Sequence, residues 1–201
     1  MDKGRIALRT FRDGLAAQAG HDLTIEVARW SAELVVSEAL APESLNVSAD
    51  LGSLVVKEGT GGLKPLTDRD KREIAVTARK VLQTERFPEA KFTATVFQPV
   101  PDSSDVTAGA HATSTSATNT GATDSPGTMR GTITLAGQSG PLELRVQTAG
   151  GGRYTASGTI RQTDFGIKPY SGFFGALKVR DTVDIEVEVD LSAAEDQETA
   201  A

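Results

Sequence analysis

The sequence predicts an all-β protein in which about eight antiparallel strands form a closed barrel accompanied by one α-helix. Three observations lead to this fold class. Apolar and polar residues alternate in many short segments, turn-forming residues separate these segments, and only one stretch has helical periodicity. A barrel of eight strands is either filled by its own side chains or holds one small apolar ligand. The fold class alone does not decide between a filled interior and a ligand-binding one.

The clearest predicted strand spans residues 183–191, where every odd position is apolar and every even position is acidic. Such alternation gives a strand one dry face and one solvated face, so we expect the four carboxylates of this segment to face water. The same alternation, in weaker form, predicts further strands at residues 45–51, 92–96, 133–135, 142–146 and 154–160.

The stretch 23–36 alternates too, but its apolar residues change parity. Leu23 and Ile25 occupy odd positions, whereas Trp30 and Leu34 occupy even positions. A strand that keeps one face inward through such a change needs one extra residue. We therefore expect a β-bulge near Ala28–Arg29, which would bend the strand and help the sheet to close.

One segment, from about Asp68 to Gln83, is predicted to be helical. Thr67 or Asp68 can cap its N-terminus, and Pro88 closes the segment. Its apolar residues recur at helical spacing and form one stripe: Ile74, Ala78, Val81 and Leu82.

The 201 residues predict a single domain over residues 1–192, followed by a solvated tail at 193–201. An insertion at 101–128 interrupts the domain, and 20 of its 28 residues are Ser, Thr, Ala or Gly. Such a segment buries too little apolar surface to offset its ordering entropy, so we expect disorder rather than a docking or modification site. No signal peptide or membrane span is visible, which predicts a cytoplasmic protein.

Composition excludes several chemistries. The chain has no cysteine, and its two histidines are His21 and His111, so a disulfide framework, a thiol nucleophile and a His-rich metal site are excluded. The net charge of −6 argues against a nucleic-acid partner. The glycine-rich stretch 59–64 lacks the spacing of a P-loop or a dinucleotide fingerprint. We expect no cofactor and no catalysis; the one enzymatic alternative would use His21 with Asp164.

An aromatic, glycine-punctuated segment spans residues 161–180. It carries Phe165, Phe173 and Phe174 immediately before the predicted strand at 183–191. Such a segment either plugs the end of the barrel or forms a portal for a lipid, and the sequence favours neither.

Four stretches of this chain resemble the YceI-like family of polyisoprenoid-binding proteins with a lipocalin-like barrel, in the order in which the family has them. They are residues 20–25 (GHDLTI), 81–92 (VLQTERFPEAKF), 131–137 (GTITLAG), and 164–167 (DFGI) followed by 179–183 (VRDTV). The resemblance implies that the barrel holds an isoprenoid chain such as a quinone or polyprenyl lipid. Members of this family are often periplasmic, which the resemblance adds beside the cytoplasmic location predicted above.

Together these observations predict a non-enzymatic protein that binds, carries or stores an isoprenoid-type lipid inside the barrel. By alternation, the expected lining residues are Leu23, Ile25, Trp30, Leu34, Phe92, Val96, Ile133, Leu144, Ile160, Ile185 and Val187. Phe165, Phe173 and Phe174 would line or gate an entrance, and His21 and Lys168 would contact a headgroup. The main alternative is a solid barrel that acts as an interaction module. An exposed strand edge could pair two copies into a homodimer.

Overall fold

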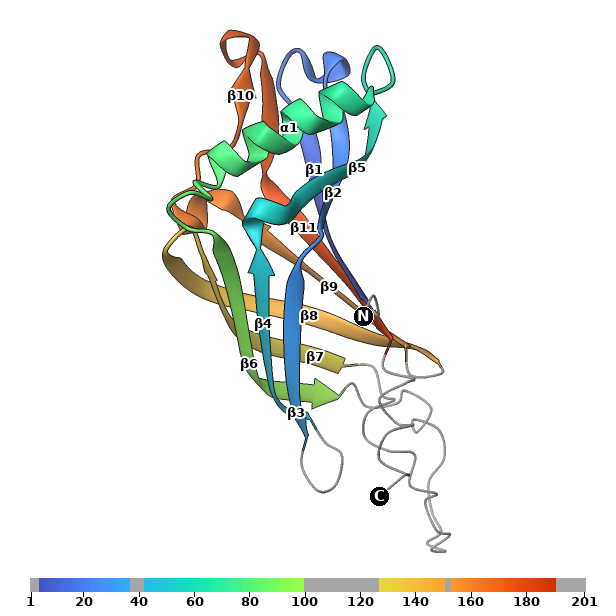
Figure 1. The fold of residues 1–201 in the computed structure, drawn as a ribbon, viewed down its shortest axis with the longest axis vertical. Helices are drawn as coiled ribbons and strands as arrows, with labels where there is room; N and C mark the ends of the chain where they lie inside the picture. Colours follow the sequence, from blue (N-terminus) through green and yellow to red (C-terminus); the bar gives the residue numbers. More distant parts are fainter. Residues whose placement is uncertain (1–3, 37–41, 100–126, 151–152, 191–201) are drawn as a thin grey trace, which may run out of the picture.

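The computed structural model describes residues 4–36, 42–99, 127–150 and 153–190 (Figure 1). The strands are β1 (Gly4–Asp13), β2 (His21–Val27), β3 (Trp30–Val36), β4 (Pro42–Asp50), β5 (Leu54–Gly61), β6 (Glu89–Pro99), β7 (Gly127–Leu135), β8 (Gln138–Gly150), β9 (Arg153–Arg161), β10 (Ser171–Gly172) and β11 (Leu177–Asp190). The helices are α1 (Asp68–Val81) and the short 3-10 helices η1 (Ala17–Ala19), η2 (Leu51–Ser53), η4 (Gln162–Phe165) and η5 (Phe173–Gly175).

All strands belong to one antiparallel sheet, with the order β3-β4-β6-β7-β8-β9-β11-β1-β2-β5 and the short β10 paired to β11. The sheet is strongly curled, through 238°, and α1 lies across the upper part of the curl (Figure 1). Thus the prediction of an all-β antiparallel fold with one helix is confirmed.

The closed barrel of about eight strands was expected, but the structure is a curled half-barrel with eleven strands in its described part. The higher count has two local causes: the two-residue β10 is an additional strand, and one long hairpin is broken in both arms. Ala28–Arg29 separate β2 from β3, and η2 separates β4 from β5. The break at Ala28–Arg29 falls where the apolar parity changes, so a two-residue interruption of the strand takes the place of the expected bulge.

Hydrogen bonds join the two breaks to each other. The amide of Ala28 donates to the carbonyl of Ser53 at 3.2 Å, and the amide of Asp50 donates to the carbonyl of Arg29 at 2.9 Å. The guanidinium of Arg29 also donates to the carboxylate of Asp50 at 2.6 Å. The chain therefore bends at a defined position, and both arms of the hairpin turn together.

The helix α1 begins with a capping box. The Thr67 hydroxyl accepts from the amide of Asp70, and the carboxylate of Asp70 accepts from the amide of Thr67. The helix ends at Val81, two residues before the predicted end, and Gln83 beyond it has a positive φ of 53°. In the described part of the chain, no helix is both long and apolar enough to cross a membrane.

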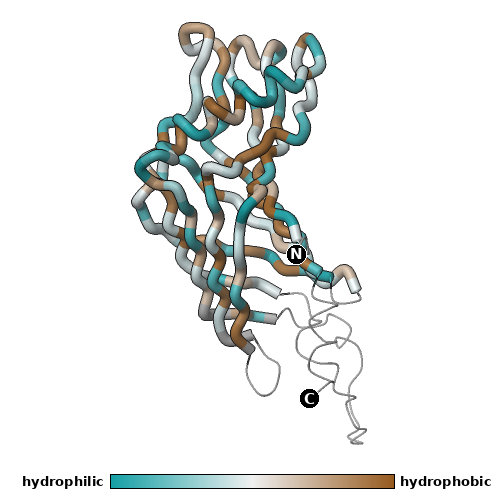
Figure 2. Tube along the Cα trace, viewed as in Figure 1, coloured by the Kyte–Doolittle hydropathy of each residue, from teal (hydrophilic) through white to brown (hydrophobic). Residues whose placement is uncertain are grey.

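Apolar side chains form two neighbouring core clusters on the concave face of the sheet. One lies beneath α1 and includes Ile6, Ile25, Val27, Leu54, Val56 and Ala75. The other lies farther along the curl and includes Phe92, Ile133, Leu144, Phe165, Ile167 and Ile185. Figure 2 shows the alternation of hydrophobic and hydrophilic residues along the strands that produces this one-sided core.

Two predicted segments fall mainly outside the described residues. Positions 101–126 of the expected insertion and the whole expected tail at 193–201 are among them. The last two residues assigned to the insertion, Gly127 and Thr128, instead begin β7, where they pair with Val146 and Arg145 of β8.

Candidate functional site

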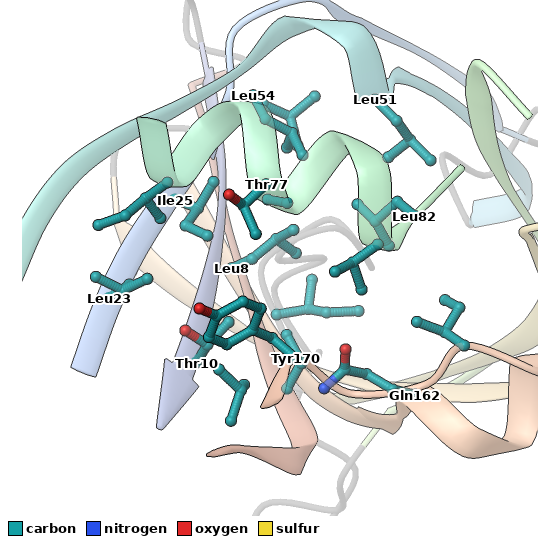
Figure 3. Close-up of a pocket in the computed structure, with 18 of the residues that line it drawn as sticks. Leu8, Thr10, Leu23, Ile25, Leu51, Leu54, Thr77, Leu82, Gln162 and Tyr170 are labelled. Atoms are coloured by element: carbon teal, nitrogen blue, oxygen red, sulfur yellow. The ribbon is translucent and has the colours of Figure 1, made fainter. Parts of the chain in front are cut away.

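A cavity of about 730 Å³ lies between the concave face of the sheet and α1 (Figure 3). Strands on opposite sides of the curl contribute to its wall, and the helix closes it from above. Its lining is predominantly aliphatic, with a few polar side chains. A volume of this size falls within the range typical of sites that bind small molecules.

The strands present their lining residues by simple alternation. In β1, Ile6, Leu8 and Thr10 all face the cavity. The register of β1 with β2 places Leu8 opposite Ile25 and Thr10 opposite Leu23, so paired residues share the same face of the sheet. Figure 3 shows these two strands side by side along one wall.

The helix presents its apolar stripe to the same space. Ile74, Ala78, Val81 and Leu82 all line the cavity, as does Thr77, and Figure 3 shows Thr77 and Leu82 directed into it. The apolar stripe from which the helix was predicted therefore also covers one side of the cavity.

The structure brings most of the residues that were predicted to line the interior to one cavity. They are Leu23, Ile25, Phe92, Ile133, Leu144, Ile160, Ile185 and Val187, together with the predicted headgroup contact His21.

Six other predicted residues with described side chains do not line this cavity: Trp30, Leu34, Phe165, Phe173, Phe174 and Lys168. Trp30 and Leu34 lie in β3, beyond the break at Ala28–Arg29; Trp30 packs at the edge of the cluster beneath α1, and Leu34 is 40% exposed. Both were predicted from the even parity that follows Ala28–Arg29, and both lie past the point at which the strand bends. The side chain of Val96, another predicted lining residue, lies outside the described part of the structure.

The aromatic segment divides between core and surface. Phe165 is 3% exposed and packs in the core cluster, whereas Phe173 is 70% exposed and Phe174 is fully exposed. Lys168 is exposed and is not among the lining residues, whereas Ile167 and Tyr170 on either side of it are. The segment thus contains one buried phenylalanine and one exposed aromatic turn; that it plugs the end of the barrel or forms a portal for a lipid stays a prediction.

Polar side chains at the edges of the cavity are held by internal hydrogen bonds. His21 Nε2 donates to the carbonyl of Lys64 at 2.8 Å, and Arg12 Nη1 donates to the carbonyl of Gly20 at 2.8 Å. The buried Gln162 donates from Nε2 to the carbonyl of Arg180 at 2.8 Å. These bonds fix the rim of the cavity and leave its interior mainly apolar.

Asp70, at the start of α1, also lies on the lining. The pKa of its carboxyl is lowered, chiefly because the hydroxyl and the amide of Thr67 donate to the carboxylate. Its negative charge therefore belongs to the cap of the helix.

Metal-ligating side chains do not gather at one place in the described part of the chain. It contains no group of three or more His, Cys, Asp or Glu side chains placed to hold a metal ion. The enzymatic alternative paired His21 with Asp164, but Asp164 is exposed on η4 and does not line the cavity that His21 lines.

Sequence analysis missed one wall of the cavity. The lining residues of β1, together with Gln162 and Tyr170, were not predicted. A signal was present, because Ile6, Leu8 and Thr10 alternate with Arg5, Ala7 and Arg9. The charges near the N-terminus obscured that alternation.

Fold and cavity together define a class of protein: a curled antiparallel sheet around an apolar cavity, covered by a single helix. A family model for the YceI-like domain matches residues 12–191. The chain therefore belongs to the YceI-like family. No curated protein matches it in sequence.

Solved structures with the same fold are distant in sequence. BcnA from Burkholderia cenocepacia shares 13% identity at a TM-score of 0.58, with 92% of this chain and 94% of that chain covered. The YCEI protein of Campylobacter jejuni shares 14% identity at a TM-score of 0.51, with coverage of 82% and 81%. A polyisoprenoid binding domain from Saccharophagus degradans shares 14% identity at a TM-score of 0.50, with 94% of each chain covered.

Proposed function

We propose that this protein binds an isoprenoid-type apolar lipid in its cavity, and carries or stores it without catalysing a reaction on it. The observation that supports this most directly is the cavity itself, about 730 Å³ and lined mainly by aliphatic side chains from the sheet and from α1. An apolar space of this size in water favours an apolar occupant, since burying apolar area contributes about 25 cal/mol per Å².

The wall around such a ligand would be continuous if each broken arm of the hairpin acts as one strand. Counted in that way, β2–β3 and β4–β5 pair with each other, β4 continues to β6, and β2 continues to β1. Eight long strands then follow one another in a ring. We propose that this ring is the functional barrel, with the bends at Ala28–Arg29 and η2 giving it an elongated shape.

Ligand class and ligand orientation are both part of the proposal. Membership of the YceI-like family and the likeness to a polyisoprenoid binding domain support an isoprenoid chain. The aliphatic lining would contact that chain through residues such as Leu23, Ile25 and Leu144. His21, which lines the cavity, is the proposed headgroup contact; Lys168 is absent from the lining, although its neighbour Ile167 belongs to it, and its contact with a headgroup stays a prediction.

Native mass spectrometry of the freshly purified full chain, followed by organic extraction, tests the proposal directly. We expect the protein to carry an apolar adduct that the extract identifies as a prenyl lipid. Empty extracts, together with no gain in emission when a fluorescent prenyl probe is added, would overturn the proposal.

A matched pair of variants on α1 tests whether the cavity is the binding site. Ala78 lines the cavity, whereas Val76 on the same helix is exposed. We expect Ala78→Trp to fill the cavity and lower the affinity for the prenyl probe by about tenfold or more. Val76→Trp should bind the probe with the affinity of the unaltered protein. In a solid interior, the ring at position 78 would instead overpack the core and lower stability by about 1–3 kcal/mol. That loss of stability, in a protein that binds no prenyl probe before or after the substitution, would favour the solid interaction module.

A further inference from the structure

Three connecting segments meet at one end of the molecule. They are residues 14–20 between β1 and β2, 62–67 between β5 and α1, and 168–176 around β10 (Figure 1). The amide of Ala16 donates to the carbonyl of Ala176 at 2.8 Å, and His21 at the start of β2 donates to the carbonyl of Lys64 at 2.8 Å. Hydrogen bonds therefore hold these three segments, called here the tip loops, as one surface.

The tip loops expose large apolar side chains. Leu15 and Phe174 are fully exposed, Leu63 is 79% exposed and Phe173 is 70% exposed. All three loops contribute, so the apolar surface belongs to the whole end of the molecule. Figure 2 shows hydrophobic colours on the β10 turn at this end. Large apolar side chains exposed together at one end of a folded protein point to a site of interaction.

The charge of the tip loops differs from that of the rest of the chain. They contain Lys64 and Lys168, both exposed, and no aspartate or glutamate, although the chain has 27 acidic residues and a net charge of −6. Asp22, at the edge of this surface, accepts from the amide of Arg12 at 2.8 Å and forms an ion pair with its guanidinium. The loops themselves thus carry two exposed lysines among their apolar residues, while the exposed carboxylates of Asp13 and Asp68 adjoin them in the chain.

The aromatic turn keeps its rings in water at a conformational cost. Phe173 and Phe174 have φ angles of 49° and 55°, in the left-handed region that bulky residues avoid. Neither ring is buried in the folded chain, so intramolecular packing does not offset this strain. A strained backbone that displays two phenylalanines suggests a role outside the isolated protein.

The cavity reaches each tip loop. Its lining includes Ala19 from the first loop, Leu63 from the second and Tyr170 from the third. A surface that receives these loops would therefore lie next to the end of the cavity.

We propose that the tip loops dock this protein on an anionic phospholipid bilayer, with Leu15, Leu63, Phe173 and Phe174 inserted at the headgroup–acyl boundary. Apolar residues combined with lysines are the usual composition of an interfacial membrane contact. The two lysines complement anionic headgroups, whereas docking against a second copy would place the same cations opposite one another. The proposal concerns the loops and holds whichever apolar molecule occupies the cavity.

Vesicle co-sedimentation of the full chain tests this docking. We expect the protein to bind vesicles of phosphatidylcholine containing phosphatidylglycerol, and to bind pure phosphatidylcholine much more weakly. The double variant Phe173→Ser, Phe174→Ser should lose about tenfold or more in partitioning, because it removes two inserted rings. Replacing either lysine with glutamine should cost about fivefold on the anionic vesicles alone.

The matched control is Leu34→Ser, which removes an exposed apolar side chain from β3 at the opposite end of the molecule (Figure 1). It should partition like the unaltered protein. A prenyl probe titrated into both variants without vesicles separates docking from cargo binding, since the rings of Phe173 and Phe174 lie away from the cavity lining.

A second measurement reports insertion itself. In Phe174→Trp, brominated lipids should quench the new tryptophan, while the native Trp30 in β3 should keep its emission. The proposal is overturned if the unaltered chain shows no preference for anionic vesicles, or if the double variant binds as well as the unaltered chain. Sedimentation velocity without vesicles supplies a further check: tip-dependent self-association without vesicle binding would assign the surface to a homodimer.

Discussion

Two regions of the same aromatic segment, residues 162–167 and 171–176, make opposite use of similar residues. Each contains a 3-10 turn, at least one phenylalanine and a glycine with positive φ. In the first region Phe165 and Ile167 are almost completely buried, whereas in the second Phe173 and Phe174 are exposed. Both regions lie in one connection, between β9 and β11.

The difference comes from what packs against each region. Phe165 and Ile167 belong to the core cluster, and Gln162 and Thr163 bond to Arg180 and Asp181 of β11. In the second region the main anchor is the backbone, since the amide of Ala176 donates to Phe173 and that of Val179 to Tyr170. Whether another element covers an aromatic residue therefore decides if it is structural or available for binding, since the two regions share the same local features.

Truncating Phe165 should give the largest effect. Phe165→Ala would leave a cavity in a close-packed core and should lower the free energy of unfolding by about 3–5 kcal/mol. Phe174→Ala is the matched control and should change it by no more than about 0.5 kcal/mol. Urea denaturation followed by circular dichroism measures both. Equal losses in the two variants would contradict the distinction between a buried and an exposed region.

The two glycines that end these turns provide a finer comparison. Gly166 has φ 68° and Gly175 has φ 89°, and an added Cβ would meet no atom within 3.4 Å at either position. Only conformational strain opposes alanine, so Gly166→Ala should cost about 1 kcal/mol. Gly175→Ala should cost less, because its exposed neighbours can shift to relieve the strain. Urea midpoints of the two variants decide the order, and a larger loss at position 175 would show that the exposed turn is the more rigid one.

The smallest effect concerns pH. The pKa of Asp181 is lowered from its ordinary 3.8, chiefly because the hydroxyl and amide of Thr163 donate to its carboxylate, with Arg161 adding to this. A depressed folded-state pKa means that the ionised form stabilises the native state. This contribution is fully present above pH 3.8 and is lost as the pH falls through the lowered value.

Asp181→Asn should therefore lower stability at neutral pH and flatten its decline in acid. The exposed neighbour Asp164→Asn serves as the control and should keep the acid-dependent decline. Urea midpoints at neutral pH and below pH 3.8 measure both variants. An unchanged decline in Asp181→Asn would show that this carboxylate does not anchor η4.

Much of the fold could be predicted from local pattern. Alternation identified the strands around Phe92, Leu144 and Ile185, and the stripe from Ile74 to Leu82 identified α1. These predictions succeeded because a strand or helix with one buried face carries its periodicity in the sequence itself. The same alternation selected eight of the residues that line the cavity.

Other features depended on contacts between distant segments. Leu34 has the alternation of a lining residue, but it lies beyond the bend that Arg29 and Asp50 hold. Phe165 and Phe174 look alike in the sequence and differ in burial because only one of them meets the core. No local pattern carries this information, because it depends on which element lies opposite.

The amino-acid order alone determined the antiparallel strands, the single amphipathic helix and the aliphatic character of the interior, because each depends on periodicity within one segment. Tertiary structure alone decided that the sheet curls without evident closure and that α1 covers a cavity of about 730 Å³. It also decided that segments 14–20 and 62–67 and the β10 turn gather at one end. The physical reason is that an enclosed volume and a shared surface belong to several segments at once, and they exist only after those segments have packed together.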